Sequence, residues 1–151
     1  MSDAISFADV AHGIIRFEPE DRVGRLILEL IDTAWVQRLR RIRQTGNTLL
    51  VYMFAEHSRF GHSLGVAYLA RRLMHHLEKR SPESVQNWEL AVGAAALLHD
   101  IGHVAPGSHL AERVWTQGSS QVAHELLSIR IVQEDPEVSA ILKRYDPELP
   151  Q

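Results

Sequence analysis

Histidines and carboxylates are the residues of this sequence whose types and spacing point to chemistry. The 151 residues include nine histidines and no cysteine, and several histidines gather between residues 57 and 124. His62 and the adjacent pair His99 and Asp100 stand out among them. Two imidazoles and one carboxylate form a ligand set that suits a divalent transition metal, Mn, Fe, Ni or Zn, alone or together with Mg. We therefore expect a metal centre on these three residues.

Helical spacing predicts that each imidazole shares a face with apolar residues. Helical steps back from His99 reach Ala96, Ala95, Val92 and Trp88. Helical steps forward from His62 reach Val66, Leu69 and Leu73. Both stripes are typical of buried helix faces, so we expect two helices that each aim one imidazole into the core. Asp100 lies about 100° further round the helix than His99 and can share a cation with it.

Simpler interpretations exist for these residues. A single histidine is more often a satisfied core residue, or lies at a helix end near favourable carbonyls. An adjacent His-Asp pair also arises by chance in a histidine-rich chain. The residues around the three candidates distinguish these interpretations from a metal site.

Two longer strings surround the candidates. Residues 59–66 read Arg-Phe-Gly-His-Ser-Leu-Gly-Val, and residues 98–103 read Leu-His-Asp-Ile-Gly-His. In these strings the chain resembles the HD-domain deoxynucleoside triphosphate triphosphohydrolases. The resemblance continues, in the family's order, at residues 9–13, 31–33, 37–44 and 124–125. It implies a helical HD domain that hydrolyses nucleotides with the help of a divalent metal.

The resemblance also implies roles for single residues. His62, His99 and Asp100 would be metal ligands, Arg59 would contact a substrate phosphate, and Gln44 would read the sugar. Arg59 precedes His62 by about one helical turn, which makes its reach to a phosphate physically reasonable. The alternatives are a solvated arginine and an ordinary polar residue at a helix end.

A second group of residues resembles the family's catalytic loop. His103 matches a histidine near the transferred phosphate, His109 the general acid that protonates the leaving oxygen, and His124 a supporting histidine. Glu112, three residues after His109, matches an acid that orients it and can raise its pKa. Alternatively, His103 could cap the helix end, and His109, Glu112 and His124 could lie on a solvated helix face. Residues 103–109 are one residue longer than the family's loop.

One family ligand has no match in this chain. The family completes its metal site with an aspartate far beyond the HD pair, accompanied by a nucleotide-clamping lysine and tyrosine. Asp135 and Asp146 come too early and have the sequence context of helix caps. We therefore expect residues 1–151 to be the N-terminal part of a single HD domain that lacks its C-terminal portion. We expect weak or no hydrolysis by residues 1–151 alone. We also expect them to form a homo-oligomer or to pair with that portion.

Periodicity along the first third of the chain predicts a small hairpin followed by helices. Residues 12–17 are short, β-branched and flanked by turns. A helix is expected from Pro19, and a second one is expected between a Thr33 cap and Gly46. Their predicted inward residues are Val23, Leu26, Ile27, Leu30 and Ile31, and then Val36, Leu39 and Ile42.

The rest of the chain predicts further helices. Residues 49–54 are an apolar run that fits either a strand or a buried turn, and Met53 and Met74 are interpreted as core fillers. Helices are expected over residues 61–79, with Val66, Leu69, Ala70, Leu73 and Leu77 buried, and from residue 82 to about residue 102. Two more follow, the last one capped by Asp135. The fold class is all-α with a minor β element.

Composition limits the remaining possibilities. The formal net charge of −3 and the pI near 6.3 argue against a protein built mainly to bind nucleic acid. The arginines at positions 38, 40, 41 and 43 are then interpreted as a solvated helix face. The start lacks a basic leader and the longest run of small apolar residues is too short to cross a bilayer, so a cytoplasmic protein is expected.

These observations predict a metal-dependent phosphohydrolase acting on a nucleotide, by attack of water on the α-phosphate with loss of triphosphate. Two alternatives stay open. A phosphodiesterase or phosphatase could use the same metal core, because the core does not choose the substrate. A catalytically incomplete HD module could bind a nucleotide or a partner protein as a regulator.

Overall fold

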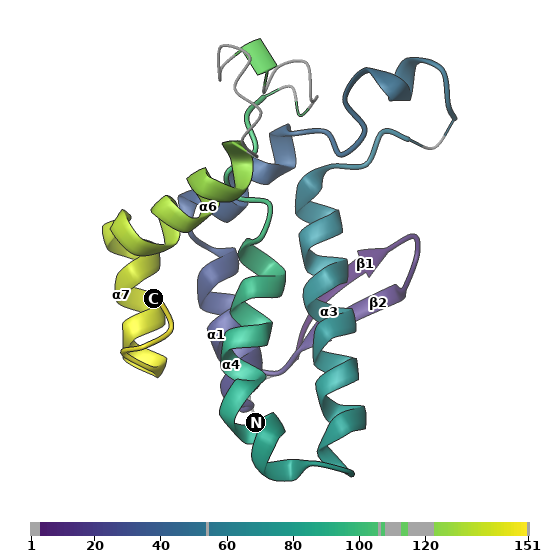
Figure 1. Ribbon diagram of the computed structural model, residues 1–151. Coiled ribbons are helices and arrows are strands. Elements are labelled where there is room, and N and C mark those ends of the chain that lie inside the picture. The colour runs from purple at the N-terminus through teal and green to yellow at the C-terminus, as the bar shows by residue number, and fades with distance from the viewer. Residues whose placement is uncertain (1–3, 54, 106, 108–112, 115–122, 151) are drawn as a thin grey trace.

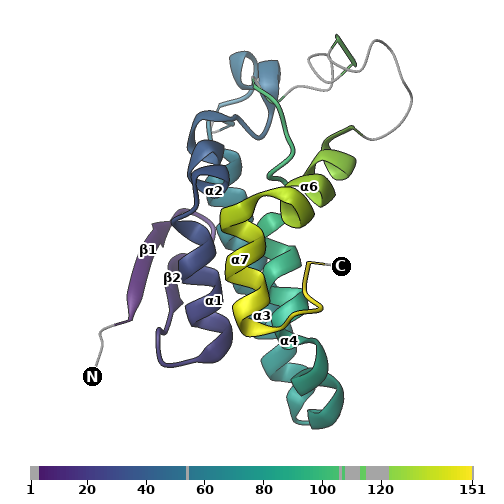
Figure 2. The same ribbon diagram turned by 90° about the vertical axis from the view of Figure 1, so that its left-hand side faces the viewer.

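The computed structural model describes residues 4–53, 55–105, 107, 113–114 and 123–150 (Figure 1). Helices α3 (Arg59–Glu78) and α4 (Pro82–Leu98) run side by side at the centre of this part of the chain. Helix α1 (Arg22–Ile31) packs against α4, and α7 (Pro136–Tyr145) packs against α1, as Figure 2 shows from the side. The expected helical bundle with a minor N-terminal hairpin is confirmed.

The hairpin pairs strand β1 (Ile5–Asp9) with strand β2 (Gly13–Phe17) in antiparallel register. Gly13 adopts a φ of 74° at the end of the turn, a conformation that favours glycine. Ile15 and Phe17 are buried in the helical core. The hairpin is therefore anchored by one face of its second strand.

Helix α1 begins at Arg22, three residues later than the start expected at Pro19. Asp21 is the N-cap, and its carboxylate accepts a hydrogen bond from the Gly24 amide. The chain turns before it, since the Asp21 amide donates to the Glu18 carbonyl over 3.1 Å. All the inward residues expected for this helix, Val23, Leu26, Ile27, Leu30 and Ile31, are buried.

The second predicted helix is shorter than expected. Thr33 caps α2 (Ala34–Arg38), which continues as the 3-10 turn η1 (Leu39–Arg41) and ends well before Gly46. The Ile42 carbonyl accepts the amide of Arg59 over 2.8 Å, so pairing with the segment before α3 replaces the helical hydrogen bonds. The expected inward residues, Val36, Leu39 and Ile42, are all buried.

The apolar run at residues 49–54 is neither a strand nor a buried turn where the structure describes it. The 3-10 turn η2 (Gly46–Leu50) leads into it, and Leu50, Val51 and Tyr52 are exposed. Met53 is 84% exposed, so its interpretation as a core filler was wrong. Apolar composition alone does not say whether a covering element exists.

The buried faces predicted for α3 and α4 were wrong at their largest residues, although Ala96 packs against the core. Leu69, Leu73 and Leu77 of α3 and Trp88 of α4 are exposed. The residues that pack in the core lie on other faces, namely Phe60, Ser63, Leu64 and Ala67 on α3, and Leu90, Gly93, Ala94, Leu97 and Leu98 on α4. Both helices carry apolar residues on more than one face, so periodicity could not identify which face of each helix the neighbouring elements cover.

The last two helices close one side of the bundle. Helix α6 (Ala123–Glu134) contacts α7, which begins at the predicted cap, Asp135, with Pro136 in its first turn. Among the described residues, no helix combines the length and the hydropathy needed to cross a membrane.

Candidate metal centre

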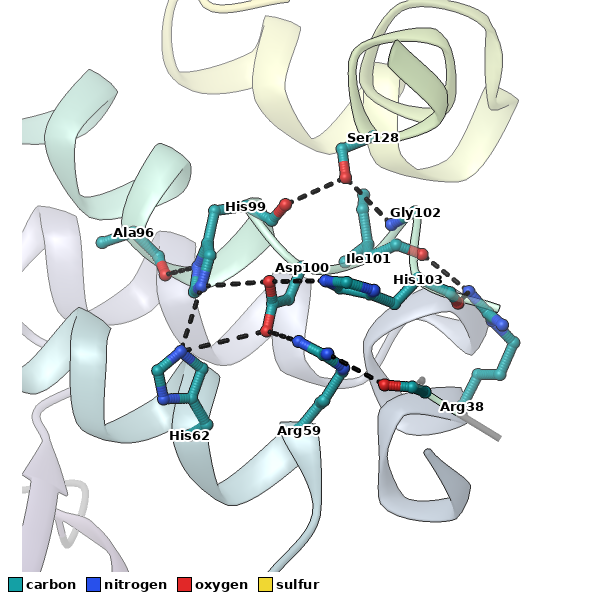
Figure 3. Close-up of polar contacts among 11 residues, drawn as sticks. Arg38, Arg59, His62, Ala96, His99, Asp100, Ile101, Gly102, His103 and Ser128 are labelled. Atoms are coloured by element: carbon teal, nitrogen blue, oxygen red, sulfur yellow. Dashed lines mark hydrogen bonds and ion pairs between the residues drawn. The ribbon is translucent and has the colours of Figure 1, made fainter. Parts of the chain in front are cut away.

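The structure brings together the three ligands predicted from the sequence. His62 lies in the first turn of α3, His99 caps the end of α4, and Asp100 follows directly. One possible ligand atom from each residue lies within 4.8 Å of the other two. It is the only such group of histidine and acidic residues in the described part of the chain (Figure 3).

The two imidazoles face each other across the gap between α3 and α4. Their Nε2 atoms are 3.3 Å apart, and the Nδ1 atom of His99 lies 2.9 Å from the Ala96 carbonyl. Because a carbonyl only accepts, Nδ1 must carry the proton, which leaves Nε2 of His99 as the ligand atom. Two nitrogens bound to one tetrahedral cation at about 2.0–2.1 Å would lie about 3.3–3.4 Å apart. The histidine pair therefore fits a divalent transition metal.

Asp100 supplies the negative charge of the site. Its Oδ2 atom lies 2.7 Å from Nη1 of Arg59, and its Oδ1 atom lies 3.3 Å from Nε2 of His99 and 3.4 Å from Nε2 of His103. Burial raises the pKa of Asp100, but the hydrogen bond from His103 and the positive charges of His99 and Arg59 together hold this pKa well below its usual range. The carboxylate is therefore ionised.

The His62 imidazole is poised in its neutral form. Burial lowers the pKa of His62, and the charges of His99 and Arg59 lower it further, although Asp100 opposes them. A neutral imidazole is the form that binds a metal. The site thus offers a neutral imidazole at His62, the Nε2 atom of His99 and an anionic oxygen of Asp100.

The imidazoles do not point into the core, contrary to the expectation. The side chains of His62 and His99 are 36% and 37% exposed, whereas that of Asp100 is only 7% exposed. The histidines lie on the same helix faces as the exposed Leu69 and Trp88. The metal centre is therefore open to solvent in the described structure.

Arg59 is buried beside the three candidate ligands. Besides its ion pair with Asp100, its Nη2 atom donates to the Gly107 carbonyl over 3.3 Å. The expected alternative of a solvated arginine was wrong, because Arg59 is only 6% exposed. Its contact with a substrate phosphate stays a prediction.

Gln44 lies in the segment between η1 and η2. Its amide donates to the carbonyl of His57 over 3.1 Å. Its Oε1 atom is buried and has no hydrogen-bond partner among the described residues. The sugar-reading role predicted for Gln44 is untested.

Of the predicted catalytic residues, His103 lies next to Asp100 and His124 lies against His103. The rings of His103 and His124 stack with their centroids 3.8 Å apart and their planes at 15°, and His103 is 3% exposed. The other two, His109 and Glu112, lie outside the described residues. The catalytic roles of all four stay predictions.

Sequence reasoning missed two residues that hold the turn after α4. Arg38, interpreted as part of a solvated face, is half-buried and donates to the carbonyls of Ile101 and His103. Ser128 on α6 bonds the backbone of the same turn. No local signal marks either residue, since each acts on residues distant in the sequence.

A largely apolar groove adjoins His99. It has a volume of about 430 Å³ and runs between α4, α6 and the C-terminal segment, with Leu98, Ile129, Val132 and Leu142 in its walls. Ligand pockets usually have volumes of about 300–1,000 Å³. The groove is therefore large enough for part of a nucleotide.

Comparison with known proteins agrees with the motif order. The HD domain family matches residues 59–146. An uncharacterised protein of Bacillus subtilis, YwfO, is 39% identical over 151 residues, which cover 100% of this chain and 32% of that protein. The deoxynucleoside triphosphate triphosphohydrolase SAMHD1 of Danio rerio is 37% identical over 153 residues, covering 96% of this chain and 24% of that protein.

The human SAMHD1 enzyme is 45% identical over 105 residues, which cover 68% of this chain and 16% of the human protein. The chain thus spans less than a third of the length of each of these three relatives.

Proposed function

The chain belongs to the HD domain family, and from that premise we propose that it forms the metal centre of a phosphohydrolase that acts on deoxynucleoside triphosphates. The observation that carries the proposal is the geometry of His62, His99 and Asp100. Two imidazole nitrogens 3.3 Å apart next to an ionised carboxylate are suited to hold a cation. The 37% identity to SAMHD1 of Danio rerio extends over 96% of this chain and supports the choice of substrate class.

His62, His99 and Asp100 would hold a divalent transition metal, Mn, Fe, Ni or Zn, with Mg as a further candidate. When bound there, such a cation would polarise a phosphoryl oxygen and lower the pKa of a water molecule. Arg59 helps His103 and His99 to keep Asp100 ionised. It also places a fixed positive charge beside the site, where a phosphate would be attracted. The buried ring of His103 orients the other oxygen of Asp100.

The proposed reaction is attack of water on the α-phosphorus, with cleavage of its bond to the 5′ oxygen of the deoxynucleoside. His109, oriented by Glu112, would give its proton to that leaving oxygen, and His124 would support the neighbouring His103. Gln44, whose Oε1 atom is buried without a described partner, would accept a hydrogen bond from the sugar. The products would be a deoxynucleoside and triphosphate.

We further propose that the exposed apolar face of α3 is covered in the working enzyme, either by a second copy or by a further length of polypeptide. Leu69, Leu73 and Leu77 follow His62 along the helix, and each is more than one third exposed. Exposed patches of this kind favour association. Separately, we propose a cytoplasmic location for the protein, as expected from its sequence.

The test of the function is metal content together with a substrate panel. The purified protein should retain a transition metal and release triphosphate from dGTP more readily than it hydrolyses bis-p-nitrophenyl phosphate. His62→Ala should lose the metal, whereas His76→Ala, an exposed histidine on the same helix, should keep it. Faster hydrolysis of the phosphodiester would favour the phosphodiesterase alternative. Nucleotide binding without turnover would favour the regulatory module.

A further inference from the structure

The turn that carries two of the metal ligands lies where a helix runs out of internal hydrogen bonds. Helix α4 ends at Leu98, and His99, Asp100 and the residues up to His103 follow in turns. Carbonyl groups at the end of a helix have no partner within it. The position of His99 and Asp100 therefore depends on what else binds this stretch of backbone.

Two side chains from distant helices bind it from different sides (Figure 3). The Ser128 hydroxyl on α6 donates to the His99 carbonyl over 3.0 Å and accepts from the Gly102 amide over 2.9 Å. The Nη2 atom of Arg38 on α2 donates to the carbonyls of Ile101 and His103 over 2.7 and 2.8 Å.

The contact with α6 is tight. Ser128 is 7% exposed, and a Cβ added at Gly102 would lie 2.1 Å from the carbonyl oxygen of His124. Only glycine lets the turn approach the α6 backbone this closely. The turn to which Ser128 bonds therefore has no room to shift toward α6.

We propose that Ser128 and Arg38 are positioning residues that fix the turn of residues 99–103 and thereby set the geometry of His99 and Asp100 as metal ligands. The inference rests on the proposed function, because it concerns the same metal centre. Neither side chain is among the three candidate ligands. Each acts through the backbone of a ligand or of a residue within three positions of one.

The effect should appear as a loss of metal affinity. Partners that orient metal ligands typically change affinity by about 10- to 100-fold when removed. Ser128→Ala removes both hydrogen bonds to the turn and adds no volume at a helical position, so the fold should persist. Arg38→Met keeps an unbranched chain and removes the donors, and Arg38→Lys restores a charged donor within reach of the same carbonyls.

The experiment measures Mn²⁺ affinity by titration calorimetry and the visible absorption of bound Co²⁺, for the whole chain and its variants. Ser128→Ala and Arg38→Met should weaken Mn²⁺ binding by about 10- to 100-fold and alter the Co²⁺ bands, and Arg38→Lys should regain part of the affinity. The matched control is Ser139→Ala on α7, a serine buried to a similar degree. Ser139→Ala should change the Mn²⁺ affinity by less than about two-fold, the usual scatter for a site that shares no partner with the turn.

Circular dichroism of the metal-free variants separates a lost fold from a lost geometry. Folded Ser128→Ala and Arg38→Met variants that bind Mn²⁺ as tightly as the parent and keep its Co²⁺ spectrum would overturn the inference while leaving the proposed function intact. Equal losses in the Ser139→Ala control would also overturn it, since packing alone would then explain them. If the parent chain binds neither ion, the proposed metal centre itself fails.

Discussion

Asp100 and Arg59 are the pair on which the site depends most at the scale of single residues. Both are buried, and their atoms meet at 2.7 Å. Removing one partner of a buried pair leaves the other charge uncompensated, which costs about 3–5 kcal/mol. Asp100→Ala should therefore lower the free energy of unfolding as well as strip the metal. Urea unfolding of the metal-free protein measures the first effect.

A double-mutant cycle provides the control for that prediction. If the loss comes from the orphaned guanidinium, Arg59→Met combined with Asp100→Ala should be more stable than the sum of the two single changes implies. Strictly additive free energies would show that the two charges do not depend on each other.

His109 gives a second prediction at the same scale. If it is the general acid, His109→Ala should lower the rate of triphosphate release by about 10²- to 10⁴-fold and leave the metal content unchanged. Steady-state turnover with dGTP and metal analysis of the same preparation check the two halves. A variant as active as the parent would assign His109 to the solvated surface.

At the scale of elements, the start of α7 couples helix capping to pH. Asp135 accepts hydrogen bonds from the amides of Val138 and Glu137 at 3.0 and 3.1 Å, and from the indole of Trp35 at 2.8 Å. The bond from Val138 lowers the pKa of Asp135 most, burial opposes it, and the bonds from Trp35 and Glu137 lower the pKa further. A lowered pKa in the folded state means that the carboxylate stabilises the fold at neutral pH.

The stability that the Asp135 carboxylate contributes should therefore decrease in acid. The contribution is fully present above the ordinary pKa of an aspartate and is lost as the pH falls through the lower pKa of the folded state. Asp135→Ala should cost about 1 kcal/mol at pH 7, the usual value of an N-cap, and less in acid. Asp135→Asn keeps a capping side chain and should retain most of that stability. Urea unfolding at pH 7 and below pH 4 tests this, and a loss in Asp135→Ala that is equal at both would contradict it.

At the scale of the whole molecule, the exposed apolar face of α3 bears on how the protein associates. We expect self-association that depends on this face, because Leu69 and Leu73 are 47% and 56% exposed on the side of the helix that carries His62. Changing both leucines to glutamine should shift the protein toward monomer in sedimentation velocity. The same change at Leu50 and Val51, which are exposed elsewhere, is the matched control. A parent chain that is monomeric at all accessible concentrations would contradict the prediction of a homo-oligomer.

Local signals in the sequence determined much of this protein. The caps at Thr33 and Asp135, the inward faces of α1 and α2 and the hairpin were all predictable, because hydrogen bonds and spacing within a few residues decide them. The grouping of His62, His99 and Asp100 was predictable for another reason. The chain resembles the HD-domain enzymes at these residues, and the family's match to residues 59–146 contains all three.

Tertiary structure alone decided which faces are covered and what surrounds the ligands. Helices α3 and α4 carry apolar residues on more than one face, and only the packing of their neighbours leaves Leu73 and Trp88 outside. The contact of Arg59 with Asp100 spans 41 residues, and that of Ser128 with Gly102 spans 26. Contacts over such separations depend on how helices pack, and packing depends on the shapes of all their side chains together, which no local period records.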